Sequence, residues 1–218
     1  MSLRLAIFDL DGTLKQARDP YVFLHKELGT WQAAQAFTGK GLGGELDYEE
    51  WLRLDALLWK GIARVTMEAA LQKNPYLPGA QETVRVLRDA GVCVAVVSTG
   101  LLLQAEQAQT DLGLDRIIAN EILFEHGRAT GKARCHVSEG AKGPIVAQLQ
   151  AEFGVEPGEC LVVGDGTSDA DMFAHAHLGV AVNPSSEQVR LAADLVLETP
   201  DLRPLIPQLE EIAPGWLA

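Results

Sequence analysis

The sequence has 218 residues, 47% of them hydrophobic and 22% charged, which fits a soluble globular protein of one domain, with or without a smaller insert. The net charge of -12 argues against nucleic-acid or anionic-membrane partners, whose phosphates attract basic surfaces. No apolar run approaches the ~20 residues that span a bilayer, and the first residues lead into a core strand rather than a signal peptide. The widely spaced Cys93, Cys135 and Cys160 fit reduced thiols, so we expect a cytoplasmic protein.

The first element in chain order is an apolar run that ends in an acidic turn. Residues 5–8 predict a buried parallel strand, and Asp9, Leu10, Asp11 and Gly12 follow it directly. Asp9 and Asp11 share one side of the chain, where two carboxylates repel each other. We therefore expect the site to supply a cation or to keep one carboxyl protonated. The alternative is a surface turn with incidental acids, since Asp and Gly favour turns.

Residues 15–75 predict a small all-helical insert. Apolar residues recur at helical spacing in segments 21–28 and 51–62, without strand-like alternation. The run Gly39–Gly44 has the G-x-G-x-x-G spacing of a dinucleotide-binding loop, but no strand precedes it. We interpret this run as a flexible loop between helices of the insert.

Beyond residue 78 the predicted elements alternate between strands and helices. Strands are expected at 92–97, 116–119, 160–163, 180–182 and 195–197, helices at 80–89, 101–112, 144–153, 171–176, 187–193 and 201–212, and a hairpin within 121–134. This alternation predicts an α/β fold with a doubly wound parallel sheet. Such sheets bind ligands at the carboxyl ends of their strands.

Polar residues occupy three further strand ends or helix starts. Ser98 and Thr99 follow the strand at 92–97, where hydroxyls and backbone N–H groups suit an anion, although they also serve as ordinary helix caps. Lys142 opens a helix at the end that the helix dipole disfavours for a cation, which favours neutralisation of a ligand. Segment 164–171 places three acids around a glycine turn, a pattern typical of metal or phosphate chemistry.

The acid pair, hydroxyl, lysine and acid cluster, in this order, resemble the four motifs of the haloacid dehalogenase-like phosphohydrolase superfamily. The first motif, D-x-D-G-T, is present as Asp9 to Thr13, the second as Ser98, the third as Lys142 and the fourth as Gly164 to Asp169. The helical insert between the first two motifs is most similar to the phosphoserine phosphatase branch. The resemblance spans nearly the whole chain.

The resemblance implies a Rossmann-like core formed by residues 1–14 and 76–218, with a helical cap formed by residues 15–75. It also implies a Mg²⁺-dependent phosphatase that acts on a small phosphomonoester through an aspartyl-phosphate intermediate. A cap excludes water from the site and favours a small soluble substrate. We expect a monomer or a homodimer.

The family resemblance assigns roles to the acidic residues. Asp9 would be the nucleophile, and Asp11 would protonate the leaving alkoxide and later deprotonate the attacking water. Mg²⁺ would bind the carboxylates of Asp9 and Asp165 and the main-chain oxygen of Asp11. Asp169 would orient a metal-bound water or brace the motif lysine.

The phosphoryl oxygens would bind Ser98, Lys142 and backbone N–H groups near Asp11 and Thr99. Ser168 stands where this branch often has Asn, which we expect to be a minor change.

Other readings of the same residues stay open. A dehalogenase needs no acid for its leaving group, which Asp11 argues against, and a phosphonate hydrolase would need a lysine of the insert such as Lys26 or Lys40. A phospho-accepting signalling domain carries its acceptor on a middle strand, but here that strand ends in Ser98. An inactive phosphate-binding protein is disfavoured because all four motifs are intact.

Two arginines bear on substrate choice. In the branch that the chain resembles, a Glu after the first motif meets the ammonium of phosphoserine and an Arg of the insert pairs with its carboxylate. The Arg matches Arg53, whereas the Glu position falls on Arg18, which repels an ammonium. We therefore expect a substrate with anionic or neutral oxygen groups near the ester and no amine. Because Asp19 adjoins Arg18, a shift of one residue would return an acid to the pocket.

Overall fold

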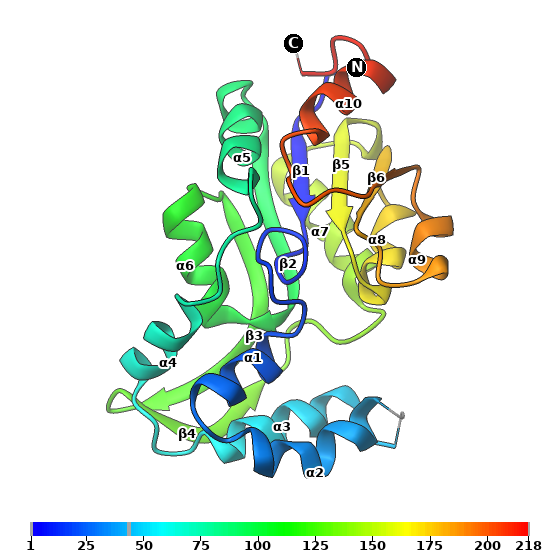
Figure 1. The fold of residues 1–218 in the computed structure, drawn as a ribbon. Helices are drawn as coiled ribbons and strands as arrows, with labels where there is room; N and C mark the ends of the chain where they lie inside the picture. Colours follow the sequence, from blue (N-terminus) through cyan, green and yellow to red (C-terminus); the bar gives the residue numbers. More distant parts are fainter. Residues whose placement is uncertain (1, 43–44, 218) are drawn as a thin grey trace.

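The computed structural model describes residues 2–42 and 45–217, which form a seven-stranded sheet flanked by helices (Figure 1). The strands are β1 (Leu5–Phe8), β2 (Cys93–Leu101), β3 (Arg116–Glu125), β4 (Arg128–Arg134), β5 (Cys160–Gly164), β6 (Leu178–Val182) and β7 (Leu195–Leu197). The helices are α1 (Pro20–Glu27), α2 (Trp31–Leu42), α3 (Tyr48–Leu58), α4 (Arg64–Leu71), α5 (Ala80–Asp89), α6 (Leu102–Leu112), α7 (Lys142–Phe153), α8 (Ala170–Phe173), α9 (Glu187–Ala192) and α10 (Leu205–Ile212).

The strand order is β4-β3-β2-β1-β5-β6-β7, and every neighbouring pair is parallel except the β3–β4 hairpin. In register, Phe8 at the end of β1 lies between Val96 of β2 and Val163 of β5. The three central strands therefore present their carboxyl ends at one edge of the sheet. This arrangement confirms the predicted doubly wound α/β fold.

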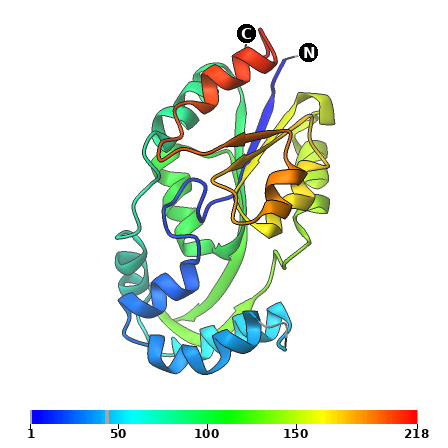
Figure 2. The same ribbon diagram turned by 45° about the vertical axis from the view of Figure 1, so that its right-hand side comes forward.

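Alternate residues of β1 supply two apolar cores, one on each face of the sheet. Ala6 and Phe8 pack with residues of α5, α6 and α10, whereas Leu5 and Ile7 pack with residues of α7, α8 and α9. Because both faces are covered, all four residues are fully buried. The double covering explains why these strands are continuous apolar runs rather than alternating ones, and Figure 2 shows the helices on either side of the sheet.

Helices α1–α4, here called the helical insert, lie between β1 and α5 in the sequence and pack against the β3–β4 hairpin (Figure 2). Leu24 and Leu52 of the insert share a buried cluster with Ile122 and Ala129 of the hairpin. The boundaries at residues 15 and 75 between a core and a cap stay a prediction. Within residues 2–42 and 45–217, no helix combines the length and apolar character needed to cross a bilayer.

Several predicted elements need correction. Gly39 and Gly41 lie inside α2 rather than in the predicted loop. At Gly41 the missing side chain lets the helix pack closely against the Trp51 ring. Residues 43 and 44 of the predicted loop are outside the described residues. Strand β2 continues to Leu101, beyond the predicted end at 97, with a register shift against β3. The predicted hairpin is confirmed, and α10 begins at Leu205 rather than at 201.

Candidate active site

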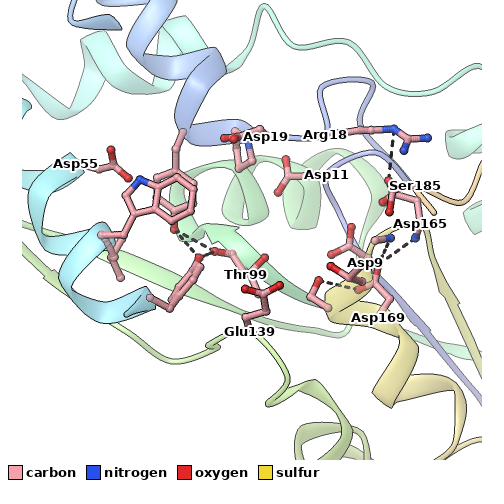
Figure 3. Close-up of a pocket in the computed structure, with 18 residues that line it drawn as sticks. Asp9, Asp11, Arg18, Asp19, Asp55, Thr99, Glu139, Asp165, Asp169 and Ser185 are labelled. Atoms are coloured by element: carbon pink, nitrogen blue, oxygen red, sulfur yellow. Dashed lines mark hydrogen bonds and ion pairs between the residues drawn. The ribbon is translucent and has the colours of Figure 1, made fainter. Parts of the chain in front are cut away.

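Three neighbouring strands deliver polar side chains to one edge of the sheet. Asp9 directly follows the last residue of β1, and Asp165 directly follows the last residue of β5. The two strands are paired in register up to Phe8 and Val163. Ser98, in the last part of β2, approaches from the other side of β1. A cavity of about 290 Å³ lies between this edge and residues of α1 and α3 (Figure 3).

Asp9, Asp165 and Asp169 form an acidic cluster. One carboxylate oxygen from each residue lies within 4.8 Å of the others, and all three side chains are almost fully buried. Burial raises the pKa of Asp9 to about 7, reinforced by the charge of Asp169 and opposed by Lys142. Burial, together with the charges of Asp9 and Asp169, raises the pKa of Asp165 to about 8. A bound cation relieves such repulsion, and hard carboxylate oxygens suit a divalent metal ion.

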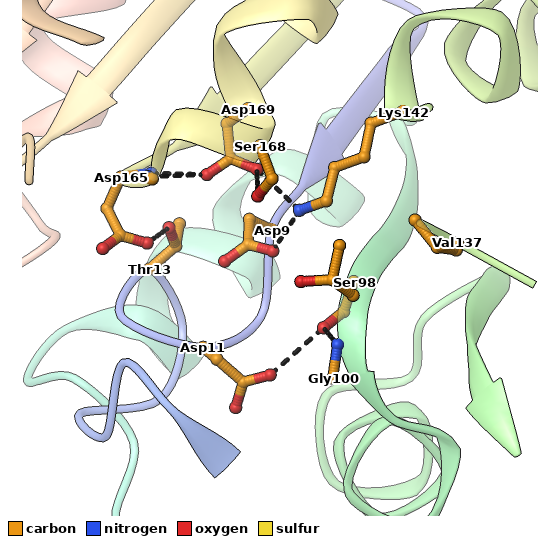
Figure 4. A network of polar contacts seen from close by, with 12 residues as sticks. Asp9, Asp11, Thr13, Ser98, Gly100, Val137, Lys142, Asp165, Ser168 and Asp169 are labelled. Atoms are coloured by element: carbon orange, nitrogen blue, oxygen red, sulfur yellow. Dashed lines mark hydrogen bonds and ion pairs between the residues drawn. The ribbon is translucent and has the colours of Figure 1, made fainter. Parts of the chain in front are cut away.

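Lys142, the first residue of α7, is the charged partner of this cluster. Its Nζ donates hydrogen bonds of 2.6 Å to Oδ1 of Asp9 and to Oδ1 of Asp169, and its side chain is fully buried (Figure 4). Burial alone would lower the pKa of Lys142, but the charges of Asp169 and Asp9 raise it above its ordinary value. The lysine therefore stays charged and offsets part of the negative charge of the cluster.

The loop after β5 folds around the carboxylate of Asp169. Oδ2 of Asp169 accepts hydrogen bonds from the backbone N–H groups of Asp165 at 2.9 Å and Gly166 at 2.8 Å. Ser168 Oγ, at 3.4 Å, donates to Oδ1 of Asp169, so the Ser at this position serves the same carboxylate. Thr13 Oγ1 donates to Oδ1 of Asp165 at 3.2 Å, which ties the first motif to the fourth (Figure 4).

Asp11 lies apart from the three clustered carboxylates and has its own partners. Ser98 Oγ donates to Oδ2 of Asp11 at 3.1 Å, and the Gln104 amide donates to Oδ1. Burial and then the charge of Asp9 raise the pKa of Asp11 well above its ordinary value, although Ser98 and Gln104 oppose this. A raised pKa favours the protonated carboxyl group, which is the form that can donate a proton to a leaving group.

Hydrogen bonds to the carbonyl oxygen of Thr99 connect the sheet edge to the helical insert. It accepts hydrogen bonds from Tyr21 Oη at 3.0 Å, from Tyr48 Oη and from Asn120 Nδ2 at 2.8 Å. Oδ1 of the fully buried Asn120 accepts hydrogen bonds from the backbone N–H groups of His136 and Val137. No sequence motif marks Gln104, Asn120 or the two tyrosines, so the sequence alone does not predict their place in the site.

The two arginines expected to select the substrate lie in different places. Arg18 lines the cavity, with Nε 3.5 Å from Oδ2 of Asp165 and Nη2 donating to the carbonyl of Asn183. Arg53 is outside the cavity: it is half-exposed and makes two 2.7 Å hydrogen bonds to Glu50 on the same helix. Arg53 is therefore not among the residues that line this cavity.

The cavity does contain an acidic side chain next to Arg18. Asp19 lines the same cavity as Arg18, and so does Asp55 of α3, which the sequence did not single out. The expectation that the pocket excludes an amine is therefore not supported, because carboxylates as well as the arginine face the cavity. Lys26 and Lys40 are exposed and are not among its lining residues, which argues against a Schiff-base phosphonate hydrolase.

Comparison with known proteins agrees with this geometry. The model of the haloacid dehalogenase-like hydrolase family matches residues 6–174. The chain belongs to this family.

Relatives within the family are similar over most of the chain. A phosphoserine phosphatase of Methanocaldococcus jannaschii is 30% identical over 93% of this chain and 96% of its own. One of Archaeoglobus fulgidus is 34% identical over 88% of this chain, which spans 55% of that relative's length. A solved structure described as a phospho-aspartyl intermediate analogue of phosphoserine phosphatase superposes with a TM-score of 0.82 at 30% identity, covering 95% of this chain and 99% of that one.

Proposed function

We propose that this protein is a Mg²⁺-dependent phosphatase that hydrolyses a small phosphate monoester through a phosphorylated Asp9. One observation carries the proposal: the buried Lys142 bridges Asp9 and Asp169 beside Asp165, at a strand edge that opens into a cavity. Similarity to the phosphoserine phosphatases and to the aspartyl-phosphate analogue supports it.

The donor set fits Mg²⁺. The carboxylates of Asp9 and Asp165, with the main-chain oxygen of Asp11, would hold the ion, and Asp169 lies close enough to bind it or a water on it. When bound, the ion neutralises charge on the phosphoryl group and on the cluster. All of these donors are oxygens, which suits Mg²⁺ better than softer metals.

The chain's own residues then divide the reaction into two displacements. A carboxylate oxygen of Asp9 forms a bond to phosphorus as the bond to the alcohol oxygen breaks, and Asp11 gives its proton to that oxygen. Water next forms a bond to phosphorus as the Asp9–phosphorus bond breaks, and Asp11 takes the proton back. Ser98, the Thr99 backbone and Lys142 would hold the phosphoryl oxygens during both steps.

The size and enclosure of the site favour a small substrate. The helical insert, proposed as a cap of residues 15–75, contributes Tyr48, Trp51 and Asp55 to the cavity wall. A volume of about 290 Å³ suits a phosphorylated metabolite rather than a polymer. The free Cys93, Cys135 and Cys160 fit a reducing compartment, so the proposal includes a cytoplasmic location. A monomer or homodimer stays a prediction.

Phosphoserine is the substrate that the names of the relatives favour, and it belongs in the first assay. Purified protein is given p-nitrophenyl phosphate and a panel of phosphorylated metabolites, with Mg²⁺ or with excess chelator. We expect phosphate release only with Mg²⁺, and none from Asp9→Asn. The exposed Asp89→Asn is the matched control and keeps wild-type activity. If no ester in the panel is hydrolysed with Mg²⁺, the proposal fails.

A further inference from the structure

The cavity has two chemically different ends. Figure 3 shows Asp9, Asp165 and Asp169 together at one end, with Arg18, and Asp55 far from them at the other. Tyr21, Tyr48 and Trp51 are the aromatic side chains of the cavity wall, and all come from the helical insert. If phosphate binds at the acidic cluster, as proposed above, the leaving group extends toward Asp55.

Asp55 is a buried carboxylate with one oxygen uncommitted. It is 2% exposed, and its Oδ1 lies 2.8 Å from Nε2 of His25, which is equally buried. Nδ1 of His25 lies 2.6 Å from Thr30 Oγ1, whose hydroxyl also donates to the His25 carbonyl at 3.5 Å. His25 therefore contacts Oδ1 of Asp55 alone. Among the described residues, none donates a hydrogen bond to Oδ2 of Asp55.

The aromatic side chains around Asp55 are held in fixed positions. The hydroxyls of Tyr21 and Tyr48 both donate hydrogen bonds to the Thr99 carbonyl. Their rings form part of the cavity wall. Behind the wall, Tyr21 stacks on Trp59 with ring centroids 6.2 Å apart. Trp51 is backed by Gly41, where a Cβ would collide with its ring. Fixed aromatic faces beside a buried carboxylate attract a cation, above all an ammonium.

Near Asp55, an anion would find no free cationic partner among the described residues that line the cavity. Arg53 is outside the cavity and paired with Glu50, and Arg18 is engaged by Asp165 at the opposite end. Lys15 is buried, donates to the Asn74 carbonyl and is not a lining residue. Of the described residues that line the cavity, Arg18 is the sole cation. A carboxylate on the leaving group would therefore face Asp55 and aromatic rings without a partner.

We propose that Asp55, Tyr21, Tyr48 and Trp51 bind an ammonium group on the leaving alcohol, so that the preferred substrate is a phosphate monoester of an amino alcohol without a carboxylate. This inference rests on the proposed phosphatase function and narrows its substrate class. It replaces the sequence-based expectation of a substrate without an amine. Phosphoserine carries the ammonium but also the carboxylate, and it ranks below the carboxylate-free esters.

The test compares wild-type kcat/KM for esters that differ in charge alone. Phosphocholine is paired with its neutral isostere 3,3-dimethylbutyl phosphate, and phosphoethanolamine with propyl phosphate. We expect each ammonium ester to exceed its neutral partner by about tenfold or more, as a desolvated ammonium over aromatic rings would give. O-Phosphoethanolamine should also exceed O-phosphoserine. The two ammonium arms distinguish a primary from a quaternary amine.

Two variants test whether a preference for ammonium esters arises at the Asp55 end of the cavity. Asp55→Asn keeps shape and removes charge, so the ratio of ammonium to neutral ester should fall about tenfold with the neutral ester's rate unchanged. Trp51→Leu tests the wall without touching the buried His25 pair, and it too should lower the ratio. Arg53→Gln, on the exposed side of α3, is the matched control and keeps the wild-type ratio.

Two results overturn the inference while leaving the phosphatase proposal intact. One is a neutral ester, or phosphoserine, hydrolysed as well as the ammonium esters. The other is a ratio that neither Asp55→Asn nor Trp51→Leu changes in folded protein. Failure of the phosphatase proposal itself looks different, because p-nitrophenyl phosphate would then also be untouched in Mg²⁺.

Discussion

The carboxamide of Gln104 donates a hydrogen bond to Oδ1 of Asp11, whose other oxygen accepts one from Ser98. Gln104 is fully buried, and its own Oε1 accepts a hydrogen bond of 3.1 Å from Asn74. The orientation of the Gln104 amide is therefore fixed by a residue outside the cavity. We infer that Gln104 is a positioning residue that aims the proposed acid Asp11.

Gln104→Leu should lower kcat by about tenfold to a hundredfold with little change in KM, because a buried acceptor that loses its hydrogen-bond donor costs roughly 1–3 kcal/mol. Steady-state kinetics on p-nitrophenyl phosphate measure both constants. Gln107→Leu, one turn further along α6, is the control, since Gln107 donates to the Glu68 carbonyl of the insert. Equal losses in the two variants would mean that α6 is merely destabilised.

Asp9→Asn should abolish turnover, by on the order of 10³-fold or more, because an amide does not attack phosphorus. The fold should survive, since the raised pKa of Asp9 means that its charge is unfavourable in the buried cluster. Circular dichroism and thermal unfolding check the fold beside the assay. Substantial turnover in pure Asp9→Asn protein would rule out Asp9 as the nucleophile.

The fold and most of the acidic site could be predicted because their signals are local. Asp9 and Asp165 each follow an apolar strand within a residue or two, and parallel strands bring such positions together. Gln104 gave no signal: it lies 93 residues from Asp11, in a helix with no motif. Only packing places its amide on that carboxylate.

The helical phase of α3 explains why Arg53, expected to select the substrate, does not line this cavity. Trp51 and Asp55, four residues apart, face the cavity, whereas Arg53 lies between them on the exposed side. Counting from a motif matches positions, but it does not tell which face of a short amphipathic helix turns inward. The helix around Gly39 and Gly41 was not predicted for a similar reason, because it depends on the packing of α2 against Trp51.

Gly12→Ala should cost both stability and metal affinity. Gly12 has a left-handed φ of 92°, and a Cβ there would lie 2.7 Å from Cγ of Asp165. The backbone strain alone costs about 1 kcal/mol, and Gly29→Ala isolates it, since Gly29 has a φ of 72° in open space. We expect Gly12→Ala to unfold at lower temperature than Gly29→Ala and to need more Mg²⁺. Indistinguishable variants would show that the Asp165 contact is unimportant.

Asp165→Ala should raise the Mg²⁺ concentration for half-maximal activity by about tenfold or more, because one carboxylate of the cluster is lost. Mg²⁺ should support activity and Zn²⁺ should not, since the clustered donors are all oxygens. Glu139→Gln is the control: Glu139 lines the cavity but is not in the cluster. Undiminished wild-type activity in excess chelator would contradict the metal assignment.

The metal-free protein should lose stability as the pH rises from about 5 to about 9. Burial raises the pKa of Asp9 to about 7 and that of Asp165 to about 8, from an ordinary 3.8, so folding favours their protonated forms. A raised folded-state pKa gives stability that is complete below the ordinary pKa and disappears as the pH rises through 7–8.

Thermal unfolding in excess chelator at both pH values, for the wild type and Asp165→Asn, measures this loss. We expect the Tm of the wild type to fall by about 3 °C or more beyond that of Asp165→Asn, since about 1 kcal/mol corresponds to 2–4 °C at this size. Excess Mg²⁺ should restore the wild type at high pH, because it binds the deprotonated carboxylates, and should restore Asp165→Asn much less. Parallel declines in the two proteins would show that the charge of Asp165 is not what destabilises the metal-free state.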